Sequence, residues 1–203
     1  QLPAILFSGY YGMHGASTMI DVLFGKVNPS GKLPFTIPAS LSQLPNFPVL
    51  PETINYDYFH GYTLIDKLNE KPAFPFGFGL SYTQFQYADA SINKQVFSEN
   101  DTIEIKLNIK NTGMQFGAEV VQAYVHFGNS QQTEHPEKLL KGFVKVFLPK
   151  EETQTIKIKI PVNSLNYYDT VKQQMQVEKM KYTIEIANSS QDKNSILLSF
   201  EVQ

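Results

Sequence analysis

The sequence contains no cysteine, which excludes disulfides, thiolate metal sites and a cysteine nucleophile. It also lacks clustered charge, because its 17 Lys and Arg residues are scattered among 19 Asp and Glu residues and the formal net charge is -2. Nucleic acids and anionic lipids are bound by basic patches, so we expect neither as a partner. No apolar run approaches the roughly 20 residues of a membrane-spanning helix, and no membrane span is expected.

Apolar material is nevertheless plentiful, since 42% of the 203 residues are hydrophobic and 13% are aromatic. This supply suffices for one large domain or two small ones. The N-terminus has neither a basic signal region nor an initiator methionine, and the sequence begins inside what resembles a buried strand. We therefore expect this chain to be a piece of a longer protein.

The first 60 residues predict a β-loop-α unit. A buried strand from Ala4 to Phe7 is followed by a glycine-spaced loop, and a helical pattern begins at about Gly15. The pattern ends before Gly25, which we expect to cap the C-terminus of the helix. The apolar face of this helix comprises Met19, Ile20, Leu23 and Phe24. One further strand candidate, "KLPFTIP" at 32–38, follows the turn "NPSG". Such a unit needs parallel neighbouring strands, which we expect outside this sequence.

From about residue 83 the pattern changes to an alternation of period two. In "TIEIKLNIKN", residues 102–111, every second side chain is apolar, which predicts a half-buried strand. Similar runs occur at 82–92, 119–127, 139–148, 153–160, 181–187 and 196–202. About seven strands in roughly 120 residues predict an immunoglobulin-like sandwich, of the fibronectin type III kind because the Cys-Trp-Cys core of antibody domains is absent.

The segment "FPFGFGLSYTQF", residues 74–85, lies between these two regions. Gly77 and Gly79 permit close backbone approach, and the surrounding phenylalanines can anchor the segment on both sides. A phosphate-binding loop is the functional alternative, but a third glycine, a Lys-Ser/Thr pair and a following helix are all missing. The sequence therefore predicts a rigid packing joint.

Three motifs in register carry a family resemblance: "IDVLFGKVNPSGKLPFTIP", "FPFGFGLSYTQF" and "HPEKLLKGFVKVFLPKEETQTIKIKI". They resemble the C-terminal half of glycoside hydrolase family 3, whose best-known members are β-glucosidases. The resemblance implies a mixed fold, in which the end of an α/β sandwich domain with a parallel sheet is followed by an all-β fibronectin type III-like sandwich. In the family a (β/α)8 barrel comes first, so residues 1–60 would end the second domain, 61–82 would form a connector, and 83–203 would form the third domain.

The same resemblance implies that this chain is the non-catalytic portion of a retaining exo-acting β-glycosidase, a β-glucosidase. Retaining enzymes use two carboxylates. In the family these are an Asp of the barrel and a Glu of the second domain, both upstream of Gln1, so no catalytic residue is expected here and the chain alone should be inactive. The alternative is a free-standing fibronectin-like module that binds a glycan or a protein. An unpaired β-loop-α unit argues against that alternative, because its open sheet edge would promote aggregation.

Candidates for the rim of the substrate site are Tyr10, Tyr11 and His14, in the loop "GYYGMHGA". The alternative is that this loop packs against the barrel domain. The loop departs from the family pattern Trp-x-Pro-Gly-Gln-x-Gly-Gly, and the chain has no Trp, the commonest platform for sugars. The four histidines have no partner at ligand spacing, so neither a metal nor a cofactor is expected.

The expected partners are the upstream barrel and sandwich segments of the same enzyme, which would bind most of a β-linked oligosaccharide or glucoside substrate. "NDT" at Asn100 and "NSS" at Asn188 are candidate glycosylation sites. Enzymes of this form are commonly exported. We therefore expect the protein to be secreted, or to lie in the cell envelope or a lysosome-like compartment.

Overall fold

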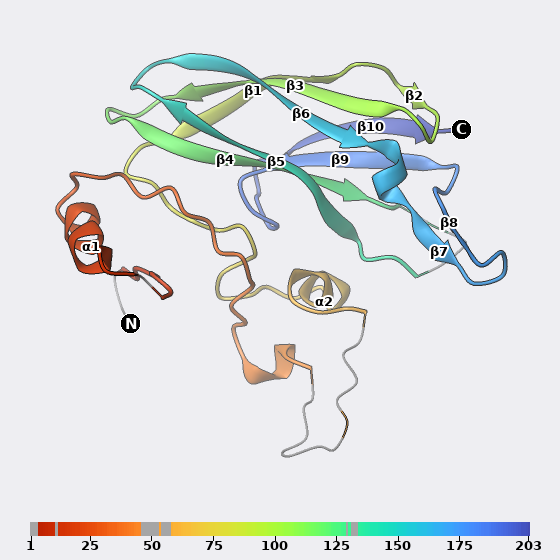
Figure 1. The fold of residues 1–203 in the computed structure, drawn as a ribbon, viewed down its shortest axis with the longest axis horizontal. Helices are drawn as coiled ribbons and strands as arrows, with labels where there is room; N and C mark the ends of the chain where they lie inside the picture. Colours follow the sequence, from red (N-terminus) through yellow and green to blue (C-terminus); the bar gives the residue numbers. More distant parts are fainter. Residues whose placement is uncertain (1–3, 11, 46–52, 54–57, 129, 131–133) are drawn as a thin grey trace.

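The computed structural model describes residues 4–10, 12–45, 53, 58–128, 130 and 134–203. Two β-sheets stack into a sandwich, and residues before the sandwich run beneath it as irregular chain with short helices (Figure 1). Among the described residues, no helix has the length and apolarity needed to cross a membrane. The fold class predicted from the sequence, the end of an α/β domain followed by a fibronectin-like sandwich, is confirmed by this architecture together with the comparisons given below.

The sandwich consists of a three-stranded and a five-stranded sheet, ordered β1-β3-β6 and β2-β10-β9-β4-β5. The first sheet contains β1 (Phe85–Ile92), β3 (Thr102–Asn111) and β6 (Thr153–Pro161). The second contains β2 (Val96–Phe97), β4 (Gly117–His126), β5 (Lys138–Leu148), β9 (Lys181–Ala187) and β10 (Ile196–Val202). A separate hairpin pairs β7 (Tyr167–Asp169) with β8 (Gln174–Gln176). Neighbouring strands are antiparallel except β2 and β10, which are parallel.

The core lies between the two sheets and follows the predicted alternation. On β3 the four alternating apolar side chains are fully buried, and β6 faces the same core through its own alternating isoleucines. The β3 set is Ile103, Ile105, Leu107 and Ile109. Each such side chain contributes about 1.5–3 kcal/mol by leaving water, so the alternation fixes the register of the pair.

All seven predicted strand runs are strands in the structure. The sequence did not predict β2, the β7–β8 hairpin or helix α2 (Tyr62–Lys67). These elements are only two to six residues long. So short a segment does not complete enough periods to be recognised.

Helix α1 (Gly15–Leu23) confirms the predicted helix and its end. Gly25 adopts a left-handed conformation with φ of 71° and donates from its N–H to the Val22 carbonyl at 2.9 Å, as expected of a C-terminal glycine. The predicted apolar face is largely open, however, with Leu23 64% and Phe24 78% exposed. The helix is thus formed locally without a partner for this face among the described residues.

The predicted strand from Ala4 to Phe7 is wrong. These residues are described, but they form no strand and their side chains are exposed. A strand requires a neighbour for its backbone hydrogen bonds, and no described segment pairs with this one. Phe7 instead contacts the edge of the Phe35 ring, with centroids 5.3 Å apart.

The second strand candidate, 32–38, pairs with the connector and not with a parallel neighbour. Ile37 and Phe74 exchange both backbone hydrogen bonds in an isolated antiparallel bridge. Closer to the sandwich, Leu33 donates to the Phe78 carbonyl at 2.9 Å, and Gly77 donates to the Leu33 carbonyl at 2.8 Å. This two-stranded ribbon attaches the N-terminal region to the connector.

Candidate functional site

The segment 74–85 forms the packing joint that the sequence predicted. Gly79 lies so close to the backbone just before the 32–38 segment that an added Cβ would be 2.2 Å from the Gly31 carbonyl oxygen. Gly77 has φ of 77°, and a Cβ there would be 2.1 Å from Gln122 Oε1 on β4. Side chains are excluded at both glycines, so the joint is held in close contact on two sides.

Gln122 connects the joint to the sandwich. Its Nε2 donates to the Gly77 carbonyl at 3.2 Å and to the Asn188 carbonyl at 2.6 Å, while its Oε1 accepts from the Tyr124 hydroxyl at 2.6 Å. The Ser190 N–H donates to the Phe76 carbonyl at 2.9 Å. A buried amide with this many partners fixes the position of the joint on β4 and on the loop after β9.

A buried ion pair fixes the other side of the joint. Lys32 Nζ lies 2.8 Å from Glu119 Oε1, with only 12% and 9% of the two side chains exposed, and Lys32 also donates to the Gly79 carbonyl at 3.0 Å. Removing either partner would leave an uncompensated buried charge. The pair therefore couples the N-terminal region, the connector and β4.

Helix α2 adds aromatic contacts beneath the joint. The Tyr62 ring stacks on Phe76 with centroids 5.0 Å apart and meets the edge of Tyr124 at 6.0 Å. The Leu140 N–H donates to the Tyr62 hydroxyl at 3.1 Å, and burial raises the pKa of Tyr62. The hydroxyl thus stays neutral and acts as a fixed contact between α2 and β5.

A carboxylate cluster lies between α2 and the five-stranded sheet. Glu185 Oε2 is 2.8 Å from both His126 Nε2 and Lys138 Nζ. Burial alone would raise the pKa of Glu185, but the hydrogen bonds from His126 and Lys138 outweigh it and lower the pKa. Glu185 is therefore a charged structural partner.

Asp66 on α2 is the carboxylate with the most perturbed acidity in this cluster. Burial raises the pKa of Asp66 to about 6, while the positive charge of Lys138 lowers it and the charge of Glu137 raises it. Asp66 Oδ2 is buried and has no hydrogen-bond partner among the described residues. A raised pKa is typical of a general acid. This oxygen is out of reach of solvent, so the structure offers it no route to a substrate.

Tyr10 and His14, two of the predicted rim residues, lie apart from the joint, just before α1. His14 is the N-cap residue of α1, and its carbonyl accepts from the Ser17 and Thr18 hydroxyls at 2.9 and 3.0 Å. The Tyr10 and His14 side chains are exposed. Tyr11 lies outside the described residues. The two described candidates thus share one short exposed loop, and no feature of this loop identifies a ligand.

The two candidate glycosylation sites differ in their surroundings. Asn100 is exposed in the turn between β2 and β3. Asn188 is also exposed, but its N–H donates to Asp192 Oδ2 and its carbonyl accepts from Gln122, and Ser190 of the same motif is buried. The backbone at Asn188 is thus part of the joint, whereas the turn at Asn100 is separate from it.

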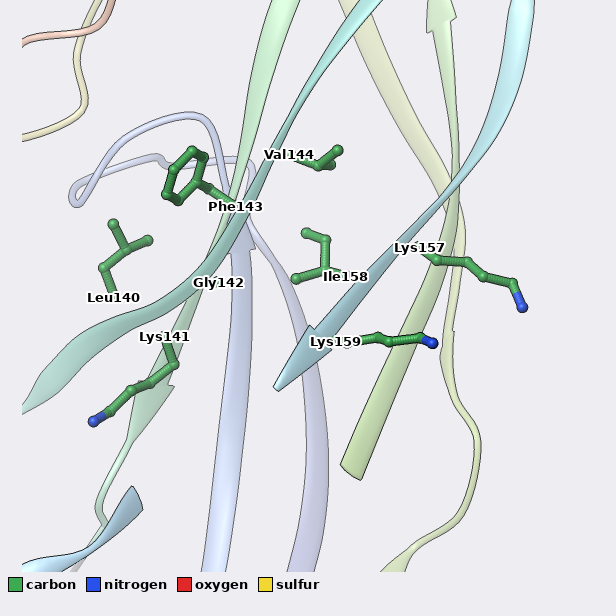
Figure 2. Close-up of a pocket in the computed structure, with 8 residues that line it drawn as sticks. All are labelled: Leu140, Lys141, Gly142, Phe143, Val144, Lys157, Ile158 and Lys159. Atoms are coloured by element: carbon green, nitrogen blue, oxygen red, sulfur yellow. The ribbon is translucent and has the colours of Figure 1, made fainter. Parts of the chain in front are cut away.

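Charged side chains line two hollows of the described surface. A groove of about 420 Å³ lies between the edges of β5 and β6, where Figure 2 shows Lys157 and Lys159 extending to one side and Lys141 to the other. These cations do not converge on a common point, so the groove is not an anion site. A second hollow of about 700 Å³ lies beside α2 and contains Asp66 and Glu185. Of the acidic residues that line it, Asp66 and Glu185 have the structural surroundings described above.

The sequence did not reveal the structural roles of Lys32, Gln122, Glu119 and the Glu185 cluster. The only available signal was the polar side chains that interrupt the apolar pattern of β4 and β9, as in "EVVQAYVHF" and "KYTIEIA". Because both faces of β4 are buried, these polar residues require internal partners. The sequence does not identify those partners.

Comparisons with known proteins define first the class and then the family. The profile of the fibronectin type III-like domain matches residues 119–190, and that of the glycosyl hydrolase family 3 C-terminal domain matches residues 1–82. The class is thus a glycosyl hydrolase C-terminal domain joined to a fibronectin-like sandwich. The chain belongs to glycoside hydrolase family 3, as its C-terminal region.

The relatives are proteins several times longer. Thermostable beta-glucosidase B of Acetivibrio thermocellus is 42% identical over 197 residues, which are 95% of this chain and 26% of that protein. The periplasmic beta-glucosidase of Salmonella typhimurium is 34% identical over 91% of this chain and 24% of its own length. The structure of beta-glucosidase 3B from Thermotoga neapolitana, in complex with alpha-D-glucose, superposes with a TM-score of 0.83 at 32% identity, over 94% of this chain and 27% of that one. This chain therefore spans about a quarter of the length of these relatives.

Proposed function

We propose that this chain is the non-catalytic C-terminal portion of a retaining exo-acting β-glucosidase that hydrolyses terminal β-D-glucosyl residues. The observation that carries the proposal is that the two domains of family 3 occur together and in order, in a chain that spans about a quarter of the length of proteins named beta-glucosidases. We assign residues 1–60 to the end of the α/β domain, 61–82 to the connector and 83–203 to the fibronectin-like domain. The catalytic carboxylates lie in the upstream part.

The surroundings of the buried carboxylates support a structural role for this portion. Glu119 is paired with Lys32, and Glu185 is paired with Lys138 and His126. A glycosidase nucleophile has to be free to attack the anomeric carbon, and its partner has to reach the leaving oxygen. Glu119 is engaged in holding the joint, Glu185 is engaged in linking β9 to β4 and β5, and the buried Asp66 oxygen does not face solvent.

The contribution of the chain to substrate binding would come from the loop before α1. We assign Tyr10, Tyr11 and His14 to the rim of the substrate site that the upstream part completes. The exposure of Tyr10 and His14 supports this assignment, because side chains packed on the sandwich could not reach a substrate. A Tyr10→Ala and His14→Ala pair in the whole enzyme should raise KM for an aryl β-glucoside without unfolding the sandwich. An unchanged KM would remove this loop from the substrate site.

We also propose that the whole protein works outside the cytoplasm, and the similarity to a periplasmic beta-glucosidase supports this location. Expression in a eukaryotic secretory host should then give glycan on at least one of Asn100 and Asn188. Mass spectrometry of the two peptides is the measurement. Unmodified masses for both would argue against these sites as acceptors.

The test of the proposed function compares the chain alone with the chain plus its upstream polypeptide. Alone, it should give only the buffer rate with aryl β-glucoside and β-xyloside substrates. Mixed with the polypeptide encoded upstream of Gln1, it should restore β-glucoside turnover. Turnover by the chain alone that is abolished by replacing one of its own Asp or Glu residues would overturn the proposal, and so would failure to assemble, which would favour a free-standing module.

A further inference from the structure

Three exposed apolar side chains gather where the β3–β4 turn meets the end of β5. Met114 is 71%, Phe116 57% and Phe147 58% exposed. The rings of Phe116 and Phe147 lie nearly parallel, with centroids 6.5 Å apart and an interplanar angle of 17°. We call Met114, Phe116 and Phe147 the apolar patch. Contiguous exposed apolar surface of this kind commonly marks an interaction site.

The patch is fixed to the N-terminal region by Asn28. The Asn28 amide donates from Nδ2 to the Phe116 carbonyl at 3.0 Å, and its Oδ1 accepts from the Tyr82 N–H at 2.8 Å and the Ser81 hydroxyl at 2.9 Å. Gly117 leaves room for this contact, since a Cβ there would be 2.8 Å from Asn28 Nδ2. The patch is therefore part of the joint region and not a free loop tip.

Helix α1 is attached to the same contact. The Tyr82 hydroxyl donates to the Val22 carbonyl in α1 at 2.9 Å, so Tyr82 contacts both α1 and Asn28. In Figure 1, α1 lies below the end of the sandwich at which β3 passes into β4 and β5 ends. The open face of α1 and the apolar patch thus lie at one end of the molecule, where one large body could cover both.

We propose that the apolar patch is a second docking surface for the upstream part of the same enzyme, beside the open face of α1; this inference rests on the proposed function. We choose the upstream part as the partner of the patch for two reasons. The relatives are about four times longer than this chain, and α1 and the patch are connected through Asn28 and Tyr82. A sugar is less suited to the site, since sugar recognition needs hydrogen-bonding groups beside the ring. The Asn28 amide already makes three hydrogen bonds.

The experiment measures the dissociation constant of the complex between this chain and the polypeptide encoded upstream of Gln1. The test variant carries Phe116→Thr and Phe147→Thr, which remove both rings and keep a β-branched side chain in β5. The control is Phe143→Thr. Phe143 lies on the same strand and face as Phe147, is 67% exposed, and lies about 13 Å from Phe147 along β5, at the groove of Figure 2. We expect binding about 30-fold weaker in the test variant and nearly unchanged in the control.

Each outcome is decisive. Equal affinity of the test variant and the control would overturn the docking surface, whereas failure of the unsubstituted chain to bind would overturn the proposed function itself. Hydrogen exchange of the unsubstituted chain does not depend on how the variant folds: in the complex, amides of 113–117 and 145–148 should gain protection together with α1. Protection of α1 alone would contradict the inference. Loss of binding to insoluble β-glucan with unchanged assembly would make the patch a sugar platform instead.

Discussion

Replacing Gly79 by alanine should open the joint between the N-terminal region and the connector. The new Cβ would lie 2.2 Å from the Gly31 carbonyl oxygen, where backbone atoms cannot simply rotate away. The two segments would have to separate, which weakens the hydrogen bond from Leu33 N–H to Phe78 and the contact of Lys32 with the Gly79 carbonyl. Overpacking of this kind costs about 1–3 kcal/mol, and a lost hydrogen bond adds about 1 kcal/mol.

The expected loss in the free energy of opening the joint is therefore about 2–4 kcal/mol, which corresponds to a fall of about 30-fold to 1,000-fold in amide protection. Native-state hydrogen exchange at Leu33, Ile37, Phe74 and Gly77 measures it, because all four amides donate across the ribbon. The β3 amides should remain protected, since the core of the sandwich is not touched.

Gly31→Ala is the matched control, because it adds the same methyl group on the other side of the same contact. A Cβ at Gly31 would meet no atom within 4 Å. Its effect should be neutral, or slightly stabilising through the reduced entropy of the unfolded chain. Equal protection of the ribbon in the Gly79 and Gly31 variants would refute the view that close backbone contact holds this joint.

Three further predictions concern charge and exposure. Because the pKa of Asp66 is raised to about 6, folding favours its protonated form. The contribution of Asp66 to stability is therefore highest below the unfolded pKa of about 3.9 and falls as pH rises through 6. The substitution Asp66→Asn should remove about 1–2 kcal/mol of this fall, allowing for the partial exposure of the residue. Thermal unfolding between pH 4 and 8 measures the effect, and parallel curves for the two proteins would contradict it. Lys32→Met should cost about 3–5 kcal/mol by leaving Glu119 buried and unpaired. Adding Glu119→Gln should recover part of that loss in denaturant unfolding, and simple additivity would argue against a coupled pair. In the chain alone, amides of α1 should exchange much faster than those of β3, because Leu23 and Phe24 are exposed; uniform strong protection would mean that α1 needs no partner.

The sequence by itself determined the sandwich strands and helix α1. Both are specified by local sequence. The alternation of apolar and polar residues is repeated over each strand, and a glycine follows the last turn of α1. The burial of Ile103, Ile105, Leu107 and Ile109 follows directly from that alternation. The role of Gly77 and Gly79 was also predictable, because two glycines among several phenylalanines indicate that the backbone there lies in close contact with its neighbours.

Only the tertiary structure decided what the polar residues do and how the first segment is arranged. Lys32 and Glu119 are distant in the sequence, and nothing in either neighbourhood specifies the other as its partner. The same holds for Gln122, whose hydrogen bonds reach Gly77 and Asn188, and for Asp66, whose acidity depends on burial between separate elements. Ala4–Phe7 shows the converse, because an apolar run becomes a strand only when a neighbouring strand satisfies its backbone, and that condition is set by tertiary contacts and not by the run itself.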